Sequence, residues 1–387
     1  MSFEVPVRDD PRPGRRGAWF GLLLAILLSL FYATHFAQHP YYNWDMVAYV
    51  AVALIDAGEP AETVHRKTYD IVAASLPPDN FAELTQQGTY RRAVAADAAL
   101  FAAQLPFYSV KPVYPAVMSL LYRAGMNPVT ASVAISAAGY AGICVLLYLW
   151  TARWLRPLVA VPLTALLFLC PYLTPIAQFS TPDALSVLVL LAGLFCIIEL
   201  NRPLSGAAIL VGSILVRPEN VIYVGVVLAY LLLFRRVAPG RLLILGAAAL
   251  TTYAAVVTSS HNYGWKTLFY FTFVDNMIDP ASFRSPLGLR DYLRIYVQQL
   301  DNMVFLGPNG FALFALVGFG AFLLKLGHRP WHDPYFHLIA LAAVFMAART
   351  LALPDGAYRM LLASYLMLAL ALIQACVSLD ARYRPPA

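Results

Sequence analysis

Hydrophobic positions along the chain fall into long runs separated by short polar groups. A run of about 20 apolar residues is long enough for a helix to cross the ~30 Å hydrocarbon core of a membrane. This pattern predicts an all-α polytopic membrane protein with about ten transmembrane helices. The predicted spans are 18–37, 129–150, 158–177, 184–200, 204–216, 221–234, 242–259, 311–326, 335–353 and 361–378.

The short runs 204–216 and 221–234 leave two interpretations open: one kinked helix or two passes. A single helix over both runs would be roughly 46 Å long at 1.5 Å per residue, and it would put Arg202 and Arg235 on opposite sides. Two passes place every short arginine-containing loop on one side, in keeping with the positive-inside rule. We therefore expect ten spans with both termini cytoplasmic.

The polar segments divide the chain into one transmembrane domain with short tails and two long outer loops. The first outer loop contains pieces with helical spacing, and one of them, 114–124, is too short to span a membrane. We expect such pieces to form juxtamembrane helices at the outer face. The expected limits are 1–17 and 379–387 for the cytoplasmic tails, 18–378 for the domain, and 38–128 and 260–308 for the outer loops.

Composition agrees with a membrane location. The 387 residues are 60% hydrophobic and 12% charged, whereas soluble domains carry about 25% charged residues. The net charge of +6 is modest and its arginines lie between apolar runs, which argues against a nucleic-acid partner. The four cysteines all lie within apolar runs, a pattern that predicts neither a disulfide framework nor a zinc site.

Charged residues recur where apolar runs end on the predicted outer side. Charges at such positions are costly and usually functional. Cations there suit an anionic phosphate, and carboxylates suit a hydroxyl to be deprotonated or a divalent metal. The residues are Asp45, Lys111, Asp183, Arg217, Glu219, Asp355 and Arg359.

Short motifs around these charges follow one another in a fixed order: Asn43-Trp44-Asp45, Lys111-Pro112-Val113-Tyr114-Pro115, Thr181-Pro182-Asp183, Arg217-Pro218-Glu219 and Tyr358-Arg359. In the order of these motifs, and in the side of the membrane on which they are predicted to lie, the chain from 18 to 359 resembles the GT-C superfamily of membrane glycosyltransferases. The nearest branch uses polyprenyl-phosphate sugars, as protein mannosyltransferases and aminoarabinose transferases do. The chain departs from that pattern where Asp45 stands without a neighbouring acid, and the outer loops would have to recognise the acceptor.

The resemblance implies an inverting transfer of a sugar from a polyprenyl-phosphate carrier to an acceptor hydroxyl, which a lipid, glycan or protein could supply. Asp45 would be the general base, and Asp183 would orient the acceptor or a cation. The cations Lys111, Arg217 and Arg359 would stabilise the leaving phosphate. Further candidates for contacts to the sugar or lipid are Tyr42, Trp44, Tyr114, Glu219, His261 and Tyr358.

The family contains both metal-dependent and metal-independent members. Because no dense acid cluster is visible, we expect no cofactor, with a divalent cation as the alternative. The Ala-, Leu- and Arg-rich composition is typical of a bacterial protein, for which the active face would be the periplasmic side of the inner membrane.

Each candidate residue also has a structural interpretation. Asp45 could cap a helix, Asp183 could favour a helix dipole, and Arg217 could simply pair with Glu219. Lys111 and Arg359 could be snorkelling anchors, and His261 a loop histidine. Arg349 lies inside an apolar run, where a partner for it could be purely structural.

Other functions stay open at this point. A lipid or solute transporter would need a midplane site and usually inverted repeats, and none is visible. A non-catalytic subunit of an envelope-polysaccharide assembly would tolerate loss of Asp45. A transferase similar to O-antigen ligases, which moves a whole cell-envelope glycan, would rely on outer-loop residues such as His261, Arg284, Arg290 and Arg294.

Overall fold

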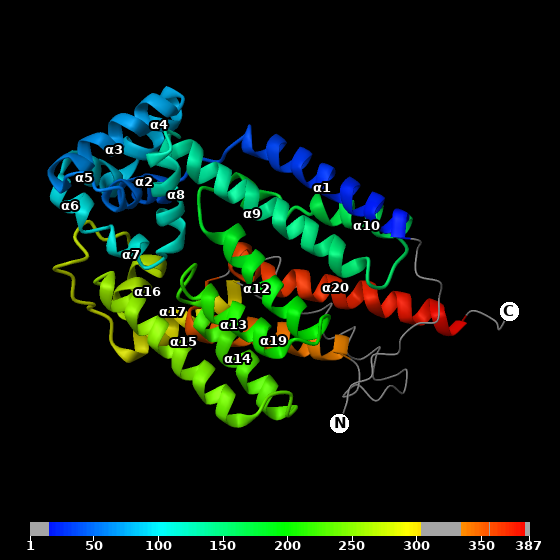
Figure 1. Cartoon of the computed structure of the whole chain (residues 1–387). Coiled ribbons are helices and arrows are strands. Elements are labelled where there is room, and N and C mark those ends of the chain that lie inside the picture. The colour runs from blue at the N-terminus through cyan, green and yellow to red at the C-terminus, as the bar shows by residue number, and fades with distance from the viewer. Residues whose placement is uncertain (1–14, 303–333, 356, 384–387) are drawn as a thin grey trace.

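The computed structural model describes residues 15–302, 334–355 and 357–383. In this part of the chain all regular structure is helical, apart from one isolated bridge between Tyr41 and Phe179. A bundle of long helices carries a cap of short helices at one end (Figure 1). The predicted all-α class is confirmed for these residues.

The bundle is formed by α1 (Arg15–Ala37), α9 (Pro128–Thr151), α10 (Pro157–Phe168), α12 (Asp183–Ile198), α13 (Pro203–Ser213), α14 (Asn220–Leu233), α15 (Pro239–Ser259), α19 (Pro334–Ala352) and α20 (Tyr358–Tyr383). The short helices are α2 (Trp44–Asp56), α3 (Ala61–Ser75), α4 (Pro78–Gln86), α5 (Gly88–Ala96), α6 (Ala98–Ala102), α7 (Pro106–Ser109), α8 (Val113–Arg123), α11 (Pro175–Gln178), α16 (Trp265–Phe273) and α17 (Leu289–Asp301). We call the end of the bundle that these short helices cover the capped end.

Within the described residues, five helical stretches are long and apolar enough to cross a membrane: Gly17–Ala37, Pro128–Thr151, Pro239–Ser259, Tyr335–Ala352 and Tyr358–Val377. The chain is therefore a membrane-embedded helical protein. The helices α10, α12, α13 and α14 are apolar but shorter. The predicted span 311–326 lies outside the described residues.

Prolines decide where two predicted spans end. The expected span 158–177 is not continuous, because α10 ends at Phe168 and turns containing Pro171 lead to α11. At that end the Tyr140 hydroxyl donates to the Phe168 carbonyl at 2.6 Å. Residues 204–234 form two helices and not one kinked helix, since the turn around Pro218 separates α13 from α14.

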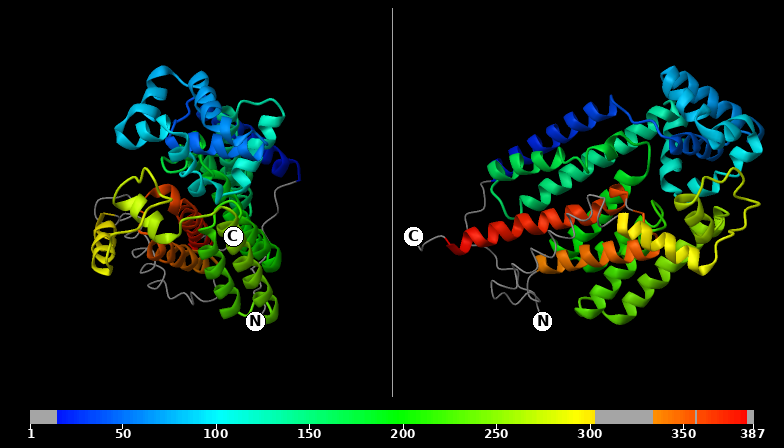
Figure 2. Two further views of the ribbon diagram at one scale, coloured as in Figure 1. Left: turned by 90° about the vertical axis from the view of Figure 1, so that its left-hand side faces the viewer. Right: turned by 180° about the vertical axis from the view of Figure 1, so that it is seen from behind.

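The two predicted outer loops form one cap. The amide of Gln104 donates to the carbonyls of Met277 at 3.2 Å and Ile278 at 2.9 Å. The rings of Phe107 and Phe271 stack with centroids 5.1 Å apart. Segments far apart in sequence therefore share a core, and the blue-to-cyan and yellow elements meet at that end in Figures 1 and 2.

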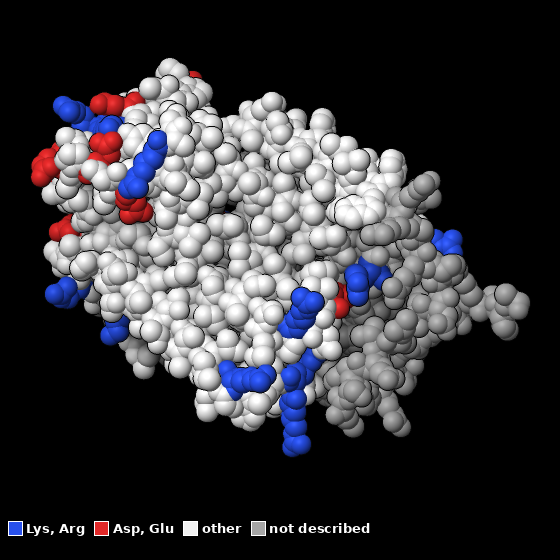
Figure 3. Space-filling model, in the orientation of Figure 1, with Lys and Arg blue, Asp and Glu red and all other residues white. Residues whose placement is uncertain are grey.

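The short turns at the opposite end of the bundle carry a group of arginines, and we call this end the arginine end. There Tyr335 and the Trp150 indole both donate to the Glu199 carboxylate at 2.9 Å, which joins α9, α12 and α19. Figure 3 shows a broad band without charged side chains between this end and the cap, as a membrane requires. The short turns of this end contain Arg153, Arg156, Arg202, Arg235, Arg236 and Arg241.

Small residues bring α12 close to its neighbours. A Cβ at Gly139 of α9 would lie 2.9 Å from the Cβ of Ala184, and a Cβ at Gly206 of α13 would lie 2.5 Å from the Gly193 carbonyl oxygen. Such contacts are typical of helix packing in membranes. They fix the position of α12, whose first residue is Asp183.

We expect Gly206→Ala to destabilise the bundle, because the added methyl group has no room against α12. Overpacking of this kind costs about 1–3 kcal/mol. Gly212→Ala on the same helix is the matched control, since a Cβ there meets nothing within 4 Å. The midpoint of thermal unfolding in detergent should fall for the first variant and hold or rise for the second. Equal midpoints would contradict this account of the packing.

Candidate functional site

Charged side chains from separate segments converge at the capped end. They are Asp45 of α2, Lys111 between α7 and α8, Asp183 of α12, Arg217 and Glu219 between α13 and α14, Arg349 of α19, and Arg359 of α20. We call this set the charged cluster. The Val113 amide donates to the Leu215 carbonyl at 3.2 Å, which ties the start of α8 to the turn that carries Arg217.

Arg217 is the centre of the charged cluster. Its guanidinium is buried, pairs with the fully buried carboxylate of Asp183, and donates to Glu219 Oε1 at 2.8 Å. The Thr181 hydroxyl donates to Asp183 Oδ2 at 2.7 Å, and Arg359 Nη1 lies 3.5 Å from the same oxygen. Both oxygens of Asp183 are thus engaged, so this carboxylate is placed to orient cations.

Local sequence explains why these groups meet. Asp183 follows Pro182 and opens α12, where an acid is favoured by the helix dipole. The Arg217-Pro218-Glu219 turn interrupts the apolar run at the same level, because proline cannot continue a helix interior.

Asp45 has a different environment. It lies in the first turn of α2, but Asn43 is the cap, because the Asn43 side chain accepts from the Met46 amide at 3.2 Å. The Asp45 carboxylate is half-buried and accepts from the Tyr108 hydroxyl at 3.1 Å. Burial first, and then the charge of Asp45, raise the pKa of Tyr108 well above its usual value, so this hydroxyl stays a donor. Asp45 is therefore a partly exposed, oriented carboxylate.

Within the charged cluster, Lys111 is the member that contacts the aromatic side chains of both Tyr49 and Tyr108. Its ammonium donates to the Tyr49 hydroxyl at 2.9 Å and lies 5.5 Å from the ring centroids of both Tyr49 and Tyr108. Burial, followed by the charge of Arg217, lowers the pKa of Lys111 to about 8. Tyr108 thus contacts both Asp45 and Lys111.

The charged cluster has an excess of positive charge. Burial alone would raise the pKa of Glu219, but the charges of Arg217, Lys111 and Arg349 outweigh it and hold that pKa well below its usual range. Glu219 is therefore ionised, and the four cations outnumber the three carboxylates by one charge. This balance suits an anion such as a phosphate.

A small cavity of about 20 Å³ opens within the charged cluster, enough for one water molecule. Asp183, Arg217, Glu219, Arg349 and Arg359 contribute to its lining. Sequence reasoning left Arg349 out as a structural residue. The sequence feature that points to Arg349 is its position near the end of an apolar run, at a depth similar to that of Arg359.

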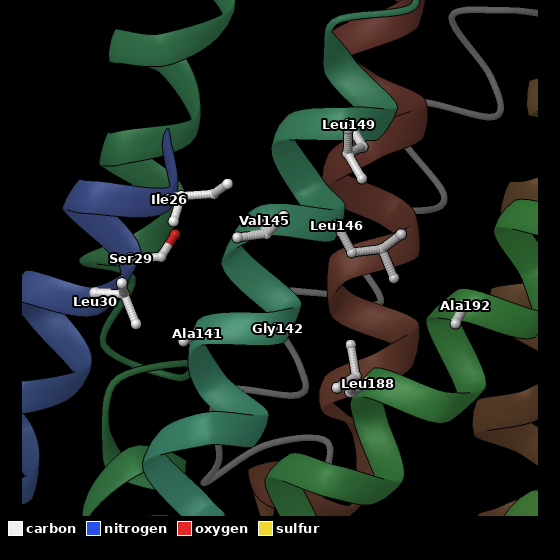
Figure 4. A pocket seen from close by; sticks show the side chains of 10 residues that line it. All are labelled: Ile26, Ser29, Leu30, Ala141, Gly142, Val145, Leu146, Leu149, Leu188 and Ala192. Carbon is white, nitrogen blue, oxygen red and sulfur yellow. The ribbon is translucent and has the colours of Figure 1, made fainter. Parts of the chain in front are cut away.

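A larger hollow lies elsewhere and has another character. It measures about 460 Å³ and is lined by α1, α9 and α12, with Ile26, Gly142 and Leu188 among its lining residues (Figure 4). Its only hydroxyl side chain, Ser29, donates to the Ala25 carbonyl of its own helix. This groove suits a hydrocarbon chain and offers no group for polar chemistry.

The other predicted site residues lie apart from the charges or within the cap. Trp44 is buried against Tyr90 and Tyr108. Tyr114 has no exposed surface and donates to the Ser132 carbonyl at 2.9 Å, so both side chains form part of the cap core.

Tyr358 and Tyr42 are half-buried, and Tyr358 precedes Arg359 at the edge of the charged cluster. His261 is exposed just after α15, and within the described part of the chain no hydrogen bond or ion pair joins it to the charged cluster. Asp355 accepts from the Ala357 amide at 2.9 Å within its own turn. Among the described residues, no group of three or more His, Cys, Asp or Glu side chains is placed to hold a metal ion.

No protein-family model, curated protein or solved structure shows significant similarity to this chain. The charged cluster is therefore interpreted from its own geometry.

We expect Asp183→Asn to destabilise the protein strongly, because it leaves the buried Arg217 guanidinium short of negative charge. Breaking a buried pair in this way costs about 3–5 kcal/mol. The control is Glu83→Gln, which removes an exposed pair with Arg91 that is 3.9 Å long and costs at most about 1 kcal/mol. Thermal unfolding in detergent compares the two, and similar losses would refute a central role for the buried pair.

Proposed function

We propose that this protein is an integral membrane glycosyltransferase. It moves a sugar from a polyprenyl-phosphate carrier to an acceptor hydroxyl, with inversion, on a GT-C-like scaffold of about ten spans. The observation that carries the proposal is a half-buried carboxylate, Asp45, beside a net positive cluster where the membrane spans end.

The arrangement divides the chemistry between two sets of groups. Asp45, oriented by Tyr108, accepts the proton of the acceptor hydroxyl while that oxygen bonds to the anomeric carbon. The bond from this carbon to the phosphate oxygen breaks, and the lipid phosphate leaves with the electron pair. Lys111, Arg217 and Arg359 stabilise the leaving phosphate, and Arg349 adds a fourth positive charge.

The arginines in the short turns support an orientation, because the positive-inside rule applies to short loops and not to the long segments of the cap. The arginine end fits the cytoplasmic side under the positive-inside rule, which puts the capped end and its charges at the outer, periplasmic face of a bacterial inner membrane. The acceptor would approach through the cap, and the carrier lipid from the bilayer.

The alternatives receive less support. A transporter would hold its charges near the membrane midplane, whereas the charged cluster lies where the helices end. For a transferase similar to O-antigen ligases, His261 and Arg284 would join the site. His261 is exposed, and the Arg284 guanidinium donates to the neighbouring Phe283 carbonyl.

Asp45→Asn should reduce sugar transfer by about 100-fold or more, because the amide cannot accept the hydroxyl proton. The assay uses purified protein in nanodiscs, a panel of radiolabelled polyprenyl-phosphate sugars and a membrane extract as acceptor. Asp56→Asn, at the exposed far end of the same helix, is the matched control and should keep full activity. Undiminished transfer by Asp45→Asn would assign the base elsewhere, and no transfer by folded wild-type protein from any donor would refute the proposed function.

Transfer should also fall as the pH rises through about 8, where Lys111 loses the proton that phosphate binding needs. The folded-state pKa lies below the unfolded value of 10.5, so protein stability rises over this interval and unfolding does not explain the loss. Lys111→Arg keeps its charge above pH 10 and should extend activity into that range. Initial rates of the unmodified protein and of Lys111→Arg are measured against pH. If the two rates fell over the same alkaline pH range, Lys111 would be excluded as the cause of the fall.

A further inference from the structure

Helix α17 presents an apolar stripe to its surroundings. Leu289, Leu293 and Val297 recur every four residues, so they share one face of the helix. Their side chains are 77%, 58% and 63% exposed. Exposed apolar faces of this kind mark surfaces that meet a partner or a membrane.

The neighbouring face of α17 is already occupied by the protein. The Tyr292 ring packs against Trp265 at 5.6 Å and Phe269 at 5.1 Å between centroids. The Tyr296 hydroxyl donates to the Thr350 carbonyl at 2.5 Å. These contacts hold α17 to α16 and α19 and leave the adjoining stripe exposed.

The depth of α17 follows from the same contacts. Thr350 and Ala352 lie in the last turn of α19, which is long and apolar enough to span a membrane. The Trp265 indole donates to the Ala352 carbonyl at 2.7 Å. Figure 2 shows α17, in yellow, beside α19, in orange. The stripe therefore lies at the level where a span leaves the hydrocarbon, the level at which tryptophan is enriched.

Basic residues flank the stripe. Arg290 and Arg294 each come directly after a stripe residue, so they lie together along one edge of the stripe. The Arg294 side chain is 76% exposed. Asp291 lies 3.6 Å from Arg294 and is the one acid on this part of the helix. An apolar face bordered by arginines is typical of helices that bind the membrane interface and anionic lipid headgroups.

We propose that α17 binds the surface of the surrounding bilayer. The stripe Leu289, Leu293 and Val297 enters the interfacial region, and Arg290 and Arg294 contact the phosphates of anionic lipids. Because Tyr292 and Tyr296 fix α17 to α16 and α19, this contact holds α16 and α17 at a constant position relative to the bilayer surface. The inference rests on the exposed stripe and its depth, and it does not require the glycosyltransferase activity.

The test places a fluorophore on each side of α17. In a full-length chain whose four cysteines are replaced by alanine, Leu293→Cys and Gln298→Cys are each labelled with an environment-sensitive NBD group. Gln298 is exposed on the side of the helix away from the stripe, which makes it the matched control. Nanodiscs of phosphatidylcholine with phosphatidylglycerol then carry nitroxide lipids at the interface.

We expect blue-shifted emission at position 293 and at least about twofold stronger nitroxide quenching there than at position 298. Water-like emission at both positions, or shielding of position 293 from lipid quencher, would overturn the proposal because the stripe would face water or protein. Equal strong quenching at both positions would also overturn it, because α17 would then be surrounded by lipid.

A second measurement uses the native cysteines, so it stays decisive if the cysteine-free chain does not fold. Backbone hydrogen exchange of α17 should slow when phosphatidylglycerol is added to phosphatidylcholine nanodiscs. Arg294→Gln should reduce this lipid-dependent slowing by about fivefold, whereas Arg92→Gln, an exposed arginine in α5, should not. If the hydrogen-exchange rate of α17 in the unmodified protein were the same with and without phosphatidylglycerol, the proposed role of the arginines would be overturned.

Discussion

The capped end depends on the buried guanidinium of Arg217. Removing a charge from water is expensive, and Arg217 is tolerated there because Asp183 and Glu219 both neutralise it. The same interaction connects α12 with the turn between α13 and α14. Arg359 of α20 approaches the Asp183 oxygen that also accepts from Thr181, so the placement of a further helix end depends on the same carboxylate.

Because of this constraint, the site has two parts that differ in how deeply their charged groups are buried. The bundle contributes fixed cations whose partners are buried with them. The cap contributes Asp45 and Lys111, which share Tyr108 and are only half-buried. A main-chain hydrogen bond from Val113 to Leu215 links the segment of Lys111 to the turn that carries Arg217. The site therefore combines a buried Arg217–Asp183 pair with a more accessible carboxylate.

Much of this organisation could be predicted from sequence. Asp183, Arg217 and Arg359 each follow the end of an apolar run, and helices of similar depth bring such ends to one level. Arg349 was missed because it lies inside a run, where the sequence does not show which way a side chain points. Trp44 and Tyr114 were assigned to ligand contacts, although aromatic residues near a membrane serve equally as cap core. Composition cannot separate these roles, because both require a large apolar ring with a polar edge.

The shared cap core has a consequence for biogenesis. Gln104 reaches its acceptor Ile278 across 174 residues, and Met277 belongs to the same core as α2 and α8. Ribosomes add about 5–20 residues per second, so the first half of the cap waits roughly 10–35 seconds for its complement. During that interval the apolar surface that Met277 and Phe271 will cover is open to chaperones, proteases and wrong partners. Slow translation between α9 and α16 would lengthen this vulnerable period, whereas the helices of the bundle can enter the membrane one after another.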